Sequence, residues 1–301
     1  MKDIFNQFII KLLPCLPLSL MWLMARRYVA GENIEDVLKA VKILNEKGFS
    51  ATVDILGEHT SDNNTARNIT REYQNLLFSI HDHHLKCNIS IKPSHLGMDI
   101  SKENIFDNMD QLIKTARENN HFIRIDMEDS TLTDNTIDLY KKCKEKYDQI
   151  GTVLQAYLFR SEKDLTQLKD GKNLNLRICK GIYREPENIS IRGRHDININ
   201  FLKLLRIVFE NNIYVGIATH DLSLLSDCYS LINELKIPND RFEFQVLYGV
   251  PMSGWLQKHL EHDYRVRVYV PFGKDWYEYS LRRLKENPDI AGYILKNIFR
   301  K

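Results

Sequence analysis

The stretch FIRIDMEDSTLTDNTIDLYKKCKEKYDQIGTVLQAY, residues 122–157, contains one complete strand, helix and strand. FIRID and TVLQAY are short and apolar on alternate positions, which is typical of strands, whereas NTIDLYKKCKEKYDQI between them predicts a helix. A helix that joins two neighbouring parallel strands is the repeating unit of α/β proteins. The stretch therefore predicts a parallel sheet with helical crossovers.

The same alternation runs along the chain from residue 50. We predict eight strands: ATVDIL from Ala51, NISIK from Asn88, FIRID from Phe122, TVLQAY from Thr152, LNLRIC from Leu174, IYVGIA from Ile213, FEFQV from Phe242 and VRVYV from Val266. Eight strand and helix units in about 250 residues have the size of an α/β protein with a (β/α)8 TIM-like barrel. A doubly wound sheet is the alternative, although it normally contains fewer strands.

One phase of the alternation in these strands is repeatedly polar, whereas buried parallel strands are usually apolar on both faces. The polar positions are Thr52, Asp54, Ser90, Lys92, Arg124, Asp126, Gln155, Asn175, Arg177, Glu243, Gln245, Arg267 and Tyr269. If the apolar phase packs on the outer helices, the polar phase points into the barrel. Several of its members sit at the C-terminal ends of the strands, where barrel enzymes hold their active sites. Salt bridges that serve packing alone are the competing explanation. Because an unpaired buried charge costs on the order of several kcal/mol, we favour a functional site.

The segment VRVYVPFGKDWYEYSLRRLKEN, residues 266–287, places a final helix directly after the eighth strand. We predict that this helix begins at Trp276. Spacings of three and four put Tyr279, Arg282, Arg283 and Glu286 on one of its faces. That face is either a solvated stripe or, if the helix lies over the barrel mouth, a clamp for an anion, and spacing alone favours the stripe.

Composition excludes several classes of function. The 42 basic and 40 acidic residues give a net charge of +2, which is too small to attract nucleic acid. The five cysteines are scattered, odd in number and without a CxxC pair, which indicates reduced thiols and a cytoplasmic setting. HDHH at residues 81–84 is compatible with a metal, but a polar helix end is the commoner explanation, so we predict no metal site.

The first 45 residues are interpreted as an N-terminal helical segment, and residues 46–301 as the barrel. The apolar run from Leu12 to Ala25 contains Pro14 and Pro17 and is shorter than the roughly 20 residues that span a bilayer. It predicts either a broken helical hairpin packed on the barrel or an apolar element that touches a membrane surface. The sequence alone weights these two interpretations equally.

Several stretches together resemble the proline dehydrogenase family, the flavin-dependent barrel enzymes that begin proline catabolism. In the family's order they are VDILGE (53–58), SIK (90–92), RIDMEDS (124–130), LQAYL (154–158), RICKGIYREP (177–186), ATHD (218–221), FEFQVLYGV (242–250), VYVPFG (268–273) and YSLRRLKEN (279–287). The compact length resembles the single-function bacterial members. The resemblance implies a modified barrel that binds FAD without a GxGxxG loop, and no such loop occurs in this sequence.

The resemblance also assigns roles to single residues. Asp126 and Arg177 are implied as catalytic residues, with Arg177 beside the flavin, where a cation favours the electron-rich reduced ring. The implied cofactor contacts are Met127, Gln155, Arg177, Lys180, Gly181, Ile182, Thr219 and His220. The implied substrate contacts are Lys92, Arg282 and Arg283 for the carboxylate, and Tyr183, Leu247 and Tyr269 for the ring. Glu286 is implied to orient the two arginines.

The implied reaction oxidises L-proline to Δ1-pyrroline-5-carboxylate, with hydride transfer from proline C5 to flavin N5, as the first step of proline degradation to glutamate. The family passes its electrons to a membrane quinone, which implies a peripheral position on the inner face of the cell membrane. A separate pyrroline-5-carboxylate (glutamate semialdehyde) dehydrogenase is the implied partner. Tyr269 favours proline, because relatives that prefer hydroxyproline carry a smaller residue there. Oxidation of hydroxyproline or another cyclic amino acid is the first alternative, and a redox-silent binding protein is the second.

Overall fold

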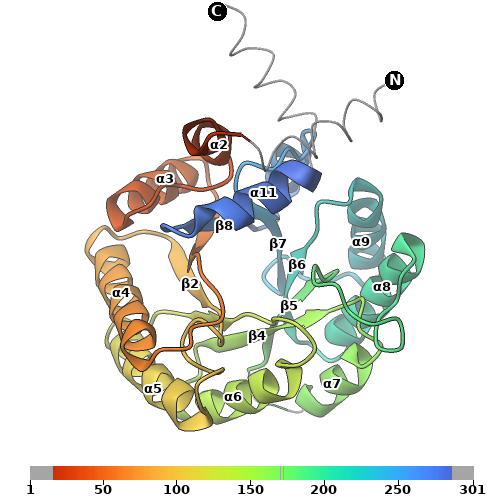
Figure 1. Ribbon diagram of the computed structural model, residues 1–301. Helices are drawn as coiled ribbons and strands as arrows, with labels where there is room; N and C mark the ends of the chain where they lie inside the picture. The colour runs from red at the N-terminus through yellow and green to blue at the C-terminus, as the bar shows by residue number, and fades with distance from the viewer. Residues whose placement is uncertain (1–15, 170, 172, 287–301) are drawn as a thin grey trace, which may run out of the picture.

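The eight predicted strands close into a single parallel barrel in chain order (Figure 1). The structure is a computed structural model that describes residues 16–169, 171 and 173–286. The strands are β1 (Ser50–Ile55), β2 (Cys87–Ile91), β3 (Ile123–Ile125), β4 (Ile150–Gln155), β5 (Asn175–Cys179), β6 (Tyr214–Ala218), β7 (Phe242–Leu247) and β8 (Val266–Phe272). Closure of β8 onto β1 confirms the (β/α)8 barrel and excludes the doubly wound sheet.

Helices surround this barrel and cover one end of it (Figure 1). Their bounds are α2 (Leu18–Ala25), α3 (Ile34–Glu46), α4 (Asn63–Asp82), α5 (Lys102–Glu118), α6 (Thr133–Lys146), α7 (Ser161–Leu168), α8 (Arg194–Glu210), α9 (Leu222–Leu235), α10 (Trp255–Glu261) and α11 (Trp276–Glu286). Local signals fix several starts: the side chains of Asp62 and Ser101 accept the backbone N–H of the third residue on and so begin α4 and α5. The final helix begins at Trp276, as predicted.

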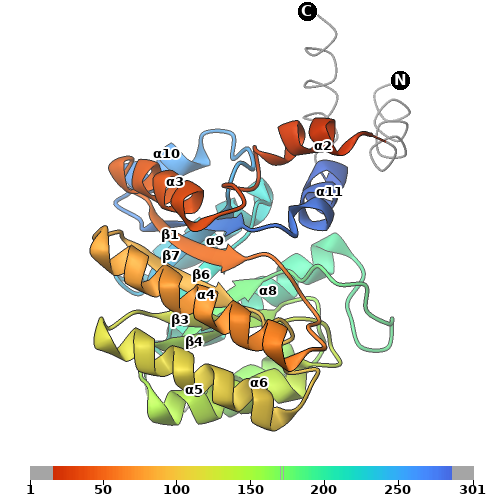
Figure 2. The ribbon, with the colours of Figure 1, turned by 60° about the vertical axis from the view of Figure 1, so that its left-hand side comes forward.

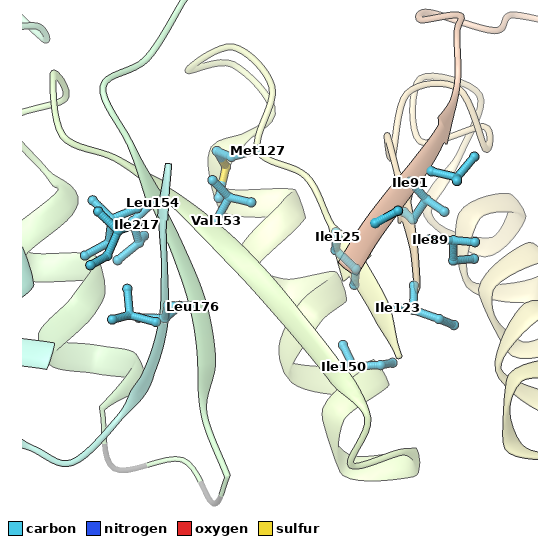
Figure 3. Close-up of a cluster of buried hydrophobic side chains, with 14 of the residues drawn as sticks. Ile89, Ile91, Ile123, Ile125, Met127, Ile150, Val153, Leu154, Leu176 and Ile217 are labelled. Carbon is cyan, nitrogen blue, oxygen red and sulfur yellow. The ribbon is translucent and has the colours of Figure 1, made fainter. Parts of the chain in front are cut away.

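The apolar phase of the strands forms the layer between barrel and helices (Figure 3). Ile89, Ile91, Ile123 and Ile125 from β2 and β3 are fully buried there. The complementary polar phase therefore fills the inside of the barrel, and Asp54, Asp126 and Arg177 are buried as the alternation predicts. The sequence pattern thus places the charged side chains in the interior, with several at the C-terminal ends of the strands.

The sheet has a gap between the C-terminal ends of β1 and β2. The paired residues of these two strands end at Val53 with Ile89, whereas β1 pairs with β8 as far as Ile55 and β2 pairs with β3 as far as Ile91. Each strand thus keeps its other neighbour beyond the point where this ladder stops. The ladder between β3 and β4 also ends early, at Arg124 with Gly151. Asp54 and Lys92 stand on the two sides of the opening between β1 and β2.

Helix α11 lies at the mouth of the barrel, and α2 packs against it (Figure 2). Met21 and Met24 of α2 and Leu284 of α11 are fully buried in one apolar cluster, and the rings of Trp22 and Trp276 lie 4.8 Å apart. Helix α2 is therefore joined to α11 through this apolar cluster. Residues 1–15 of the predicted hairpin lie outside the described residues.

The predicted boundary between residues 45 and 46 falls within α3. Val37 and Val41 of this helix belong to the barrel core, and α3 contacts β1 and β8. The division into two parts stays a prediction. In the part of the chain that is described, no helix has both the length and the apolar character that a membrane crossing requires.

Candidate active site

A cavity of about 1250 Å³ lies at the C-terminal ends of the strands, beneath α11. It exceeds the roughly 300–1,000 Å³ of a typical small-molecule pocket, so it has room for a large cofactor together with a small substrate. The predicted site residues all line it: Lys92, Asp126, Met127, Gln155, Arg177, Lys180, Gly181, Ile182, Tyr183, Thr219, His220, Leu247, Tyr269, Arg282 and Arg283. Residues from seven strands or the turns that follow them, and from α11, are thus brought to one place.

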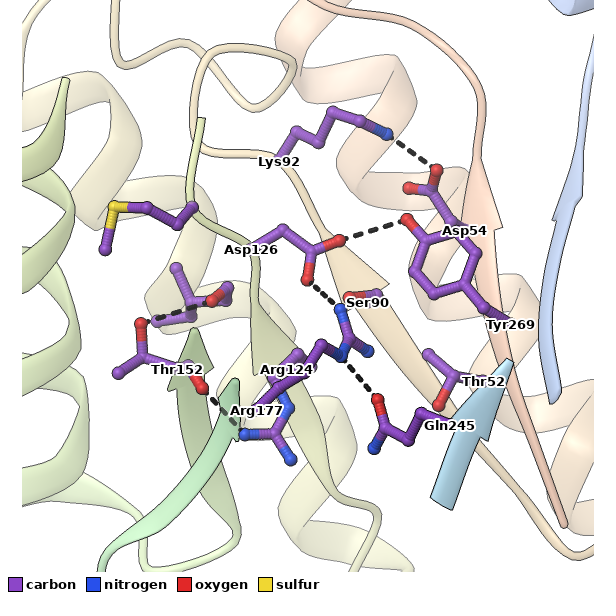
Figure 4. Close-up of polar contacts among 12 residues, drawn as sticks. Thr52, Asp54, Ser90, Lys92, Arg124, Asp126, Thr152, Arg177, Gln245 and Tyr269 are labelled. Carbon is purple, nitrogen blue, oxygen red and sulfur yellow. Dashed lines mark hydrogen bonds and ion pairs between the residues drawn. The ribbon is translucent and has the colours of Figure 1, made fainter. Parts of the chain in front are cut away.

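Arg177 stands at the centre of a fixed polar network on the cavity floor (Figure 4). Its Nη1 donates to Asp126 Oδ1 at 2.6 Å, and its Nε donates to Gln245 Oε1 at 2.5 Å. The Tyr269 hydroxyl donates to the other oxygen of Asp126 at 3.0 Å. Because Asp126 holds both partners from β8 and β5, a cation and a phenol are presented to the cavity in one preset arrangement.

Lys92 supplies a second fixed cation. Its Nζ lies 2.6 Å from Asp54 Oδ2, across the gap between β1 and β2. Burial opposes the charge of this ammonium, but the carboxylates of Asp54 and Asp126 outweigh it and raise the pKa of Lys92. The side chain therefore keeps its positive charge at neutral pH, as an anion site requires.

The arginine face of α11 is turned to the cavity, so it is not a wholly solvated stripe. Arg282 is 45% exposed and its Nη2 lies 4.0 Å from Glu58 Oε1. Arg283 is only 5% exposed, and its guanidinium carbon lies 5.5 Å from the centre of the Tyr279 ring. The side chain of Glu286, predicted to orient both arginines, lies outside the described residues.

Another cation of the cavity lining, Lys180, is paired with the carboxylate of Asp221. This carboxylate also accepts from Arg194 Nε at 3.0 Å and Asn198 Nδ2 at 3.1 Å. The same side chain caps α9 through its contact with the Ser223 N–H, so the network is anchored on a helix. Lys180 and Arg194 both line the cavity and form a basic wall there.

His220 is a neutral group with a defined tautomer. The Leu247 N–H donates to His220 Nε2 at 2.8 Å, so the proton of the neutral ring is on Nδ1. Burial, helped by the charge of Arg283, lowers its pKa to about 4. His220 is therefore a donor at neutral pH that carries no charge.

Gly181 and Gln155 show that part of the wall suits a flat, hydrogen-bonding group. Gly181 has φ +107°, and a Cβ there would lie 2.1 Å from the Tyr157 ring, so only glycine fits the turn. Gln155 donates to the Glu128 carbonyl at 3.2 Å, while its buried Oε1 has no hydrogen-bond partner among the described residues. An unsatisfied buried acceptor costs about 1–3 kcal/mol, so this oxygen suits a bound N–H donor such as that of a flavin ring.

Sequence reasoning missed three side chains that shape the cavity. Gln245 holds Arg177, Asp221 holds Lys180, and Glu128 accepts the Ser94 N–H at 2.8 Å. Burial raises the pKa of Glu128 to about 7. All three lie in the family-like stretches or in the polar phase of the strands, so the sequence marked them as polar residues near the site. It did not show that they support other side chains of the site.

No group of three or more His, Cys, Asp or Glu among the described residues is placed to hold a metal ion. The HDHH run lies where α4 ends at Asp82, with His83 at its C-cap. The described part of this run is thus a polar helix end, which was the preferred interpretation.

Comparison with known proteins gives the family. The family model described as proline dehydrogenase matches residues 37–294. The chain belongs to the proline dehydrogenase family. Proline dehydrogenase 1 of Bacillus subtilis (strain 168) is 36% identical over 278 residues, which cover 92% of this chain and 91% of that protein. Proline dehydrogenase of Deinococcus radiodurans is 35% identical over 286 residues, with 93% and 91% coverage.

Solved structures place the same family fold in larger proteins. The crystal structure of proline utilization A from Bdellovibrio bacteriovorus, inactivated by N-propargylglycine, matches with a TM-score of 0.80 and 25% identity. The match covers 88% of this chain and 32% of that one, so this proline dehydrogenase family member spans about a third of the larger protein. The single-function relatives, in contrast, are matched over nearly their whole length.

Proposed function

We propose that this protein oxidises L-proline to Δ1-pyrroline-5-carboxylate with bound FAD, as the first step of proline degradation. The observation that carries the proposal is one cavity that is lined by the neutral donor His220, by the Arg177 and Asp126 pair, and by the three cations Lys92, Arg282 and Arg283. Family membership supports the same reaction. When bound, FAD would accept the hydride that leaves C5 of proline.

The substrate carboxylate is proposed to lie among Lys92, Arg282 and Arg283. Two guanidinium groups and one ammonium supply more donors than a carboxylate has lone pairs, and they come from two separate elements. Tyr269, Leu247 and Tyr183 line the same cavity and would enclose the apolar ring. Held in this way, the ring would present C5 in one orientation, and a fixed orientation of the reacting atoms lowers the activation barrier.

The cofactor is proposed to contact Met127, Gln155, Arg177, the turn at Lys180, Gly181 and Ile182, and Thr219 with His220. Gln155 offers its free acceptor, His220 a neutral donor and Gly181 a surface without a side chain. The basic wall of Lys180 and Arg194 suits phosphate groups. Arg177, fixed by Asp126, would stabilise negative charge that develops on the cofactor.

An anaerobic absorbance scan tests this function directly. We expect the purified protein to show an oxidised flavin spectrum that bleaches on addition of L-proline and bleaches far less with hydroxyproline. N-propargylglycine, which inactivated the Bdellovibrio protein, is expected to block the bleaching. A flavin that hydroxyproline reduces as fast as proline would favour the alternative substrate. Protein that takes up no FAD during reconstitution would contradict the proposal and favour a binding protein.

We further propose that a membrane quinone takes the electrons and that the protein docks on the inner face of the cell membrane. The support is the outer surface of α2, where Leu18 is 66% exposed and Leu23 48% exposed, beside the cavity roof formed by α11. Flotation with lipid vesicles tests the docking. Leu18→Ser together with Leu23→Ser is expected to release the protein from vesicles and slow its reaction with a lipid-soluble quinone, but not with a water-soluble acceptor.

The product is proposed to pass to a separate pyrroline-5-carboxylate (glutamate semialdehyde) dehydrogenase. The match covers 24% of the bifunctional protein PutA of Escherichia coli, at 28% identity, but 91% of proline dehydrogenase 1 of Bacillus subtilis, so this chain is similar in extent to the latter. Trapping with ortho-aminobenzaldehyde, which forms a coloured adduct with Δ1-pyrroline-5-carboxylate, identifies the product. Mixing with such a dehydrogenase, in the presence of an electron acceptor for each of the two enzymes, should then convert proline to glutamate.

A further inference from the structure

Tyr73 of α4 reaches from the outer helix layer into the gap between β1 and β2. The residue is fully buried, and its hydroxyl accepts the Ile55 N–H at 3.1 Å. The same hydroxyl donates to the Ser90 carbonyl at 3.0 Å. One side chain from a helix is therefore bonded to the backbones of two neighbouring strands.

The two backbone groups that Tyr73 joins are those that the sheet itself would have joined. Where the ladder starts, the Ala51 N–H donates to the Lys86 carbonyl. In a parallel ladder this bond recurs at every second residue on each strand, so its third occurrence would run from the Ile55 N–H to the Ser90 carbonyl. The Tyr73 hydroxyl is inserted at that position. The early end of the ladder therefore has a physical cause, because a phenol oxygen occupies the place of a strand hydrogen bond.

The opening lies beside the Lys92 and Asp54 pair. Asp54 follows Val53, the last residue of β1 paired with β2, and Lys92 directly follows β2. Asp54 Oδ1 lies 3.3 Å from the Tyr73 hydroxyl, while Asp54 Oδ2 lies 2.6 Å from Lys92 Nζ. The hydroxyl that keeps the two strands apart thus lies beside the carboxylate that holds the ammonium of Lys92.

We propose that Tyr73 is a positioning residue that sets Lys92 for the carboxylate of the substrate by holding β1 and β2 apart. This inference rests on the proposed function, because it concerns the same substrate site. Tyr73 is not a catalytic residue, since it does not line the cavity. Without the hydroxyl, the Ile55 N–H and the Ser90 carbonyl either close the ladder or stay unsatisfied, and both outcomes move Asp54 and Lys92.

The test compares Tyr73→Phe with a matched control, Tyr147→Phe. Tyr147 at the end of α6 is also a buried tyrosine of the outer helix layer, and its hydroxyl donates to the His121 carbonyl at 2.8 Å. It lies before β4, however, at the other end of the barrel. For Tyr73→Phe we expect the KM for proline to rise about tenfold while the maximal rate of flavin bleaching changes less than about twofold. For Tyr147→Phe we expect an unchanged KM, although both variants lower Tm.

A binding titration gives a readout that does not depend on turnover. Tetrahydrofuran-2-carboxylate keeps the ring and the carboxylate of proline but has oxygen in place of the nitrogen. Its binding, followed by the change in flavin absorbance, should weaken about tenfold in Tyr73→Phe while the spectrum of the free protein stays the same. A weakening of equal size in Tyr147→Phe would show a general loss of stability and overturn the inference.

A second variant keeps the inference testable if Tyr73→Phe does not fold. Asp54→Asn keeps the shape of the carboxylate, and because Tyr73 acts through Asp54, this variant must raise the KM for proline at least as much. A normal KM in Asp54→Asn, or a Tyr73→Phe effect confined to the maximal rate, would overturn the positioning role. The wild-type protein separates the two proposals: if L-proline does not reduce its flavin, the proposed function itself fails.

Discussion

The two ends of the barrel interior are both rich in charge, but they use it differently. At the N-terminal end, Arg267 Nε lies 2.7 Å from Glu243 Oε1, and Arg124 donates to the carbonyls of Thr152 and Asn175 at 2.8 and 2.9 Å. At the C-terminal end, charges also pair, but Lys92 and Arg177 open onto the large cavity (Figure 4). The cavity at the N-terminal end is only about 400 Å³.

The difference teaches that a buried charge by itself does not mark a site. In the Arg267 and Glu243 pair, the attraction between the two charges is larger than the effect of burial on either group. The pKa of Glu243 is therefore lowered and the pKa of Arg267 is raised. Arg124 has no carboxylate partner among the described residues, and burial with the nearby charge of Arg177 lowers its pKa to about 9. Charges at this end hold the barrel together, whereas charges at the other end remain available to a ligand.

The largest expected effect breaks the structural pair. Arg267→Met leaves Glu243 buried without its cation, so the free energy of unfolding should fall by about 3–5 kcal/mol. Urea denaturation measures this loss. The folded fraction at low temperature should still bleach with proline at the wild-type rate. A loss of less than about 1 kcal/mol would show that the N-terminal pair is not structural.

The next effect concerns Arg177 at the other end. In Arg177→Met the rate of flavin bleaching by proline should fall at least about 10²-fold, because a preset cation is lost beside the reacting groups. The unfolding free energy should fall less than in Arg267→Met, since water in the cavity can reach Asp126. Stopped-flow bleaching and urea denaturation on the same sample give both values. Equal losses of unfolding free energy in the two variants would show that Arg177 is as important for stability as Arg267, which would contradict the proposed difference between the two ends of the barrel.

A smaller effect is expected for the exposed arginine of α11. Arg282→Met should raise the KM for proline on the order of tenfold and leave the flavin spectrum nearly intact, because it removes ground-state binding of the carboxylate. Arg206→Met on α8 is the matched control, since Arg206 is similarly exposed and pairs with Glu234 at 2.8 Å far from the cavity. Loss of FAD with unchanged affinity for proline would contradict the proposed clamp.

The smallest effect compares two histidines with the same shift. Burial lowers the pKa of His220, at the cavity, and of His259, near the start of β8, to about 4 in each case. The unfolded chain binds protons near pH 6.5 and the native state does not, so stability falls as the pH drops from about 6.5 toward 4. Each His→Gln variant should lose about 1 kcal/mol less stability than wild type between pH 7 and 5.

These two variants should differ only in cofactor retention, which dialysis followed by absorbance measures. His220→Gln is expected to release flavin sooner, and His259→Gln is expected to keep it. If both lose flavin alike, His220 has no special part in the site. The same pKa shift at both ends shows that burial, and not function, is its cause.

Much of this architecture could be predicted from the sequence. Alternation within the strands predicts whether a side chain points into the barrel or toward the outer helices. The structure places Asp126 and Arg177 inside the barrel, as expected. Alternation does not give depth along the barrel axis, so Arg124 and Arg267 carried the same signal as Arg177. Depth follows from the stagger between strands, which only closure fixes.

Contacts between layers could not be predicted. Tyr73 stands at an apolar position of an amphipathic helix, where its phenol has the same helical spacing as any core side chain. Its partners are backbone groups of β1 and β2, which carry no sequence signal of their own. Packing of α2 on α11 was equally hidden, because it joins segments more than 200 residues apart, between Leu18–Ala25 and Trp276–Glu286.

The pairing of β1 with β8 also sets an order of assembly during synthesis. A growing chain cannot close its barrel until Val266–Phe272 has left the ribosome, and the arginines of α11 follow only after that. Such distant contacts form slowly, because a long loop must close before they stabilise anything. The closed barrel, and with it the cavity that β8 and α11 line, therefore cannot form until nearly the whole chain has been made. A cofactor that binds in this cavity would accordingly be taken up only at the end of synthesis or after it.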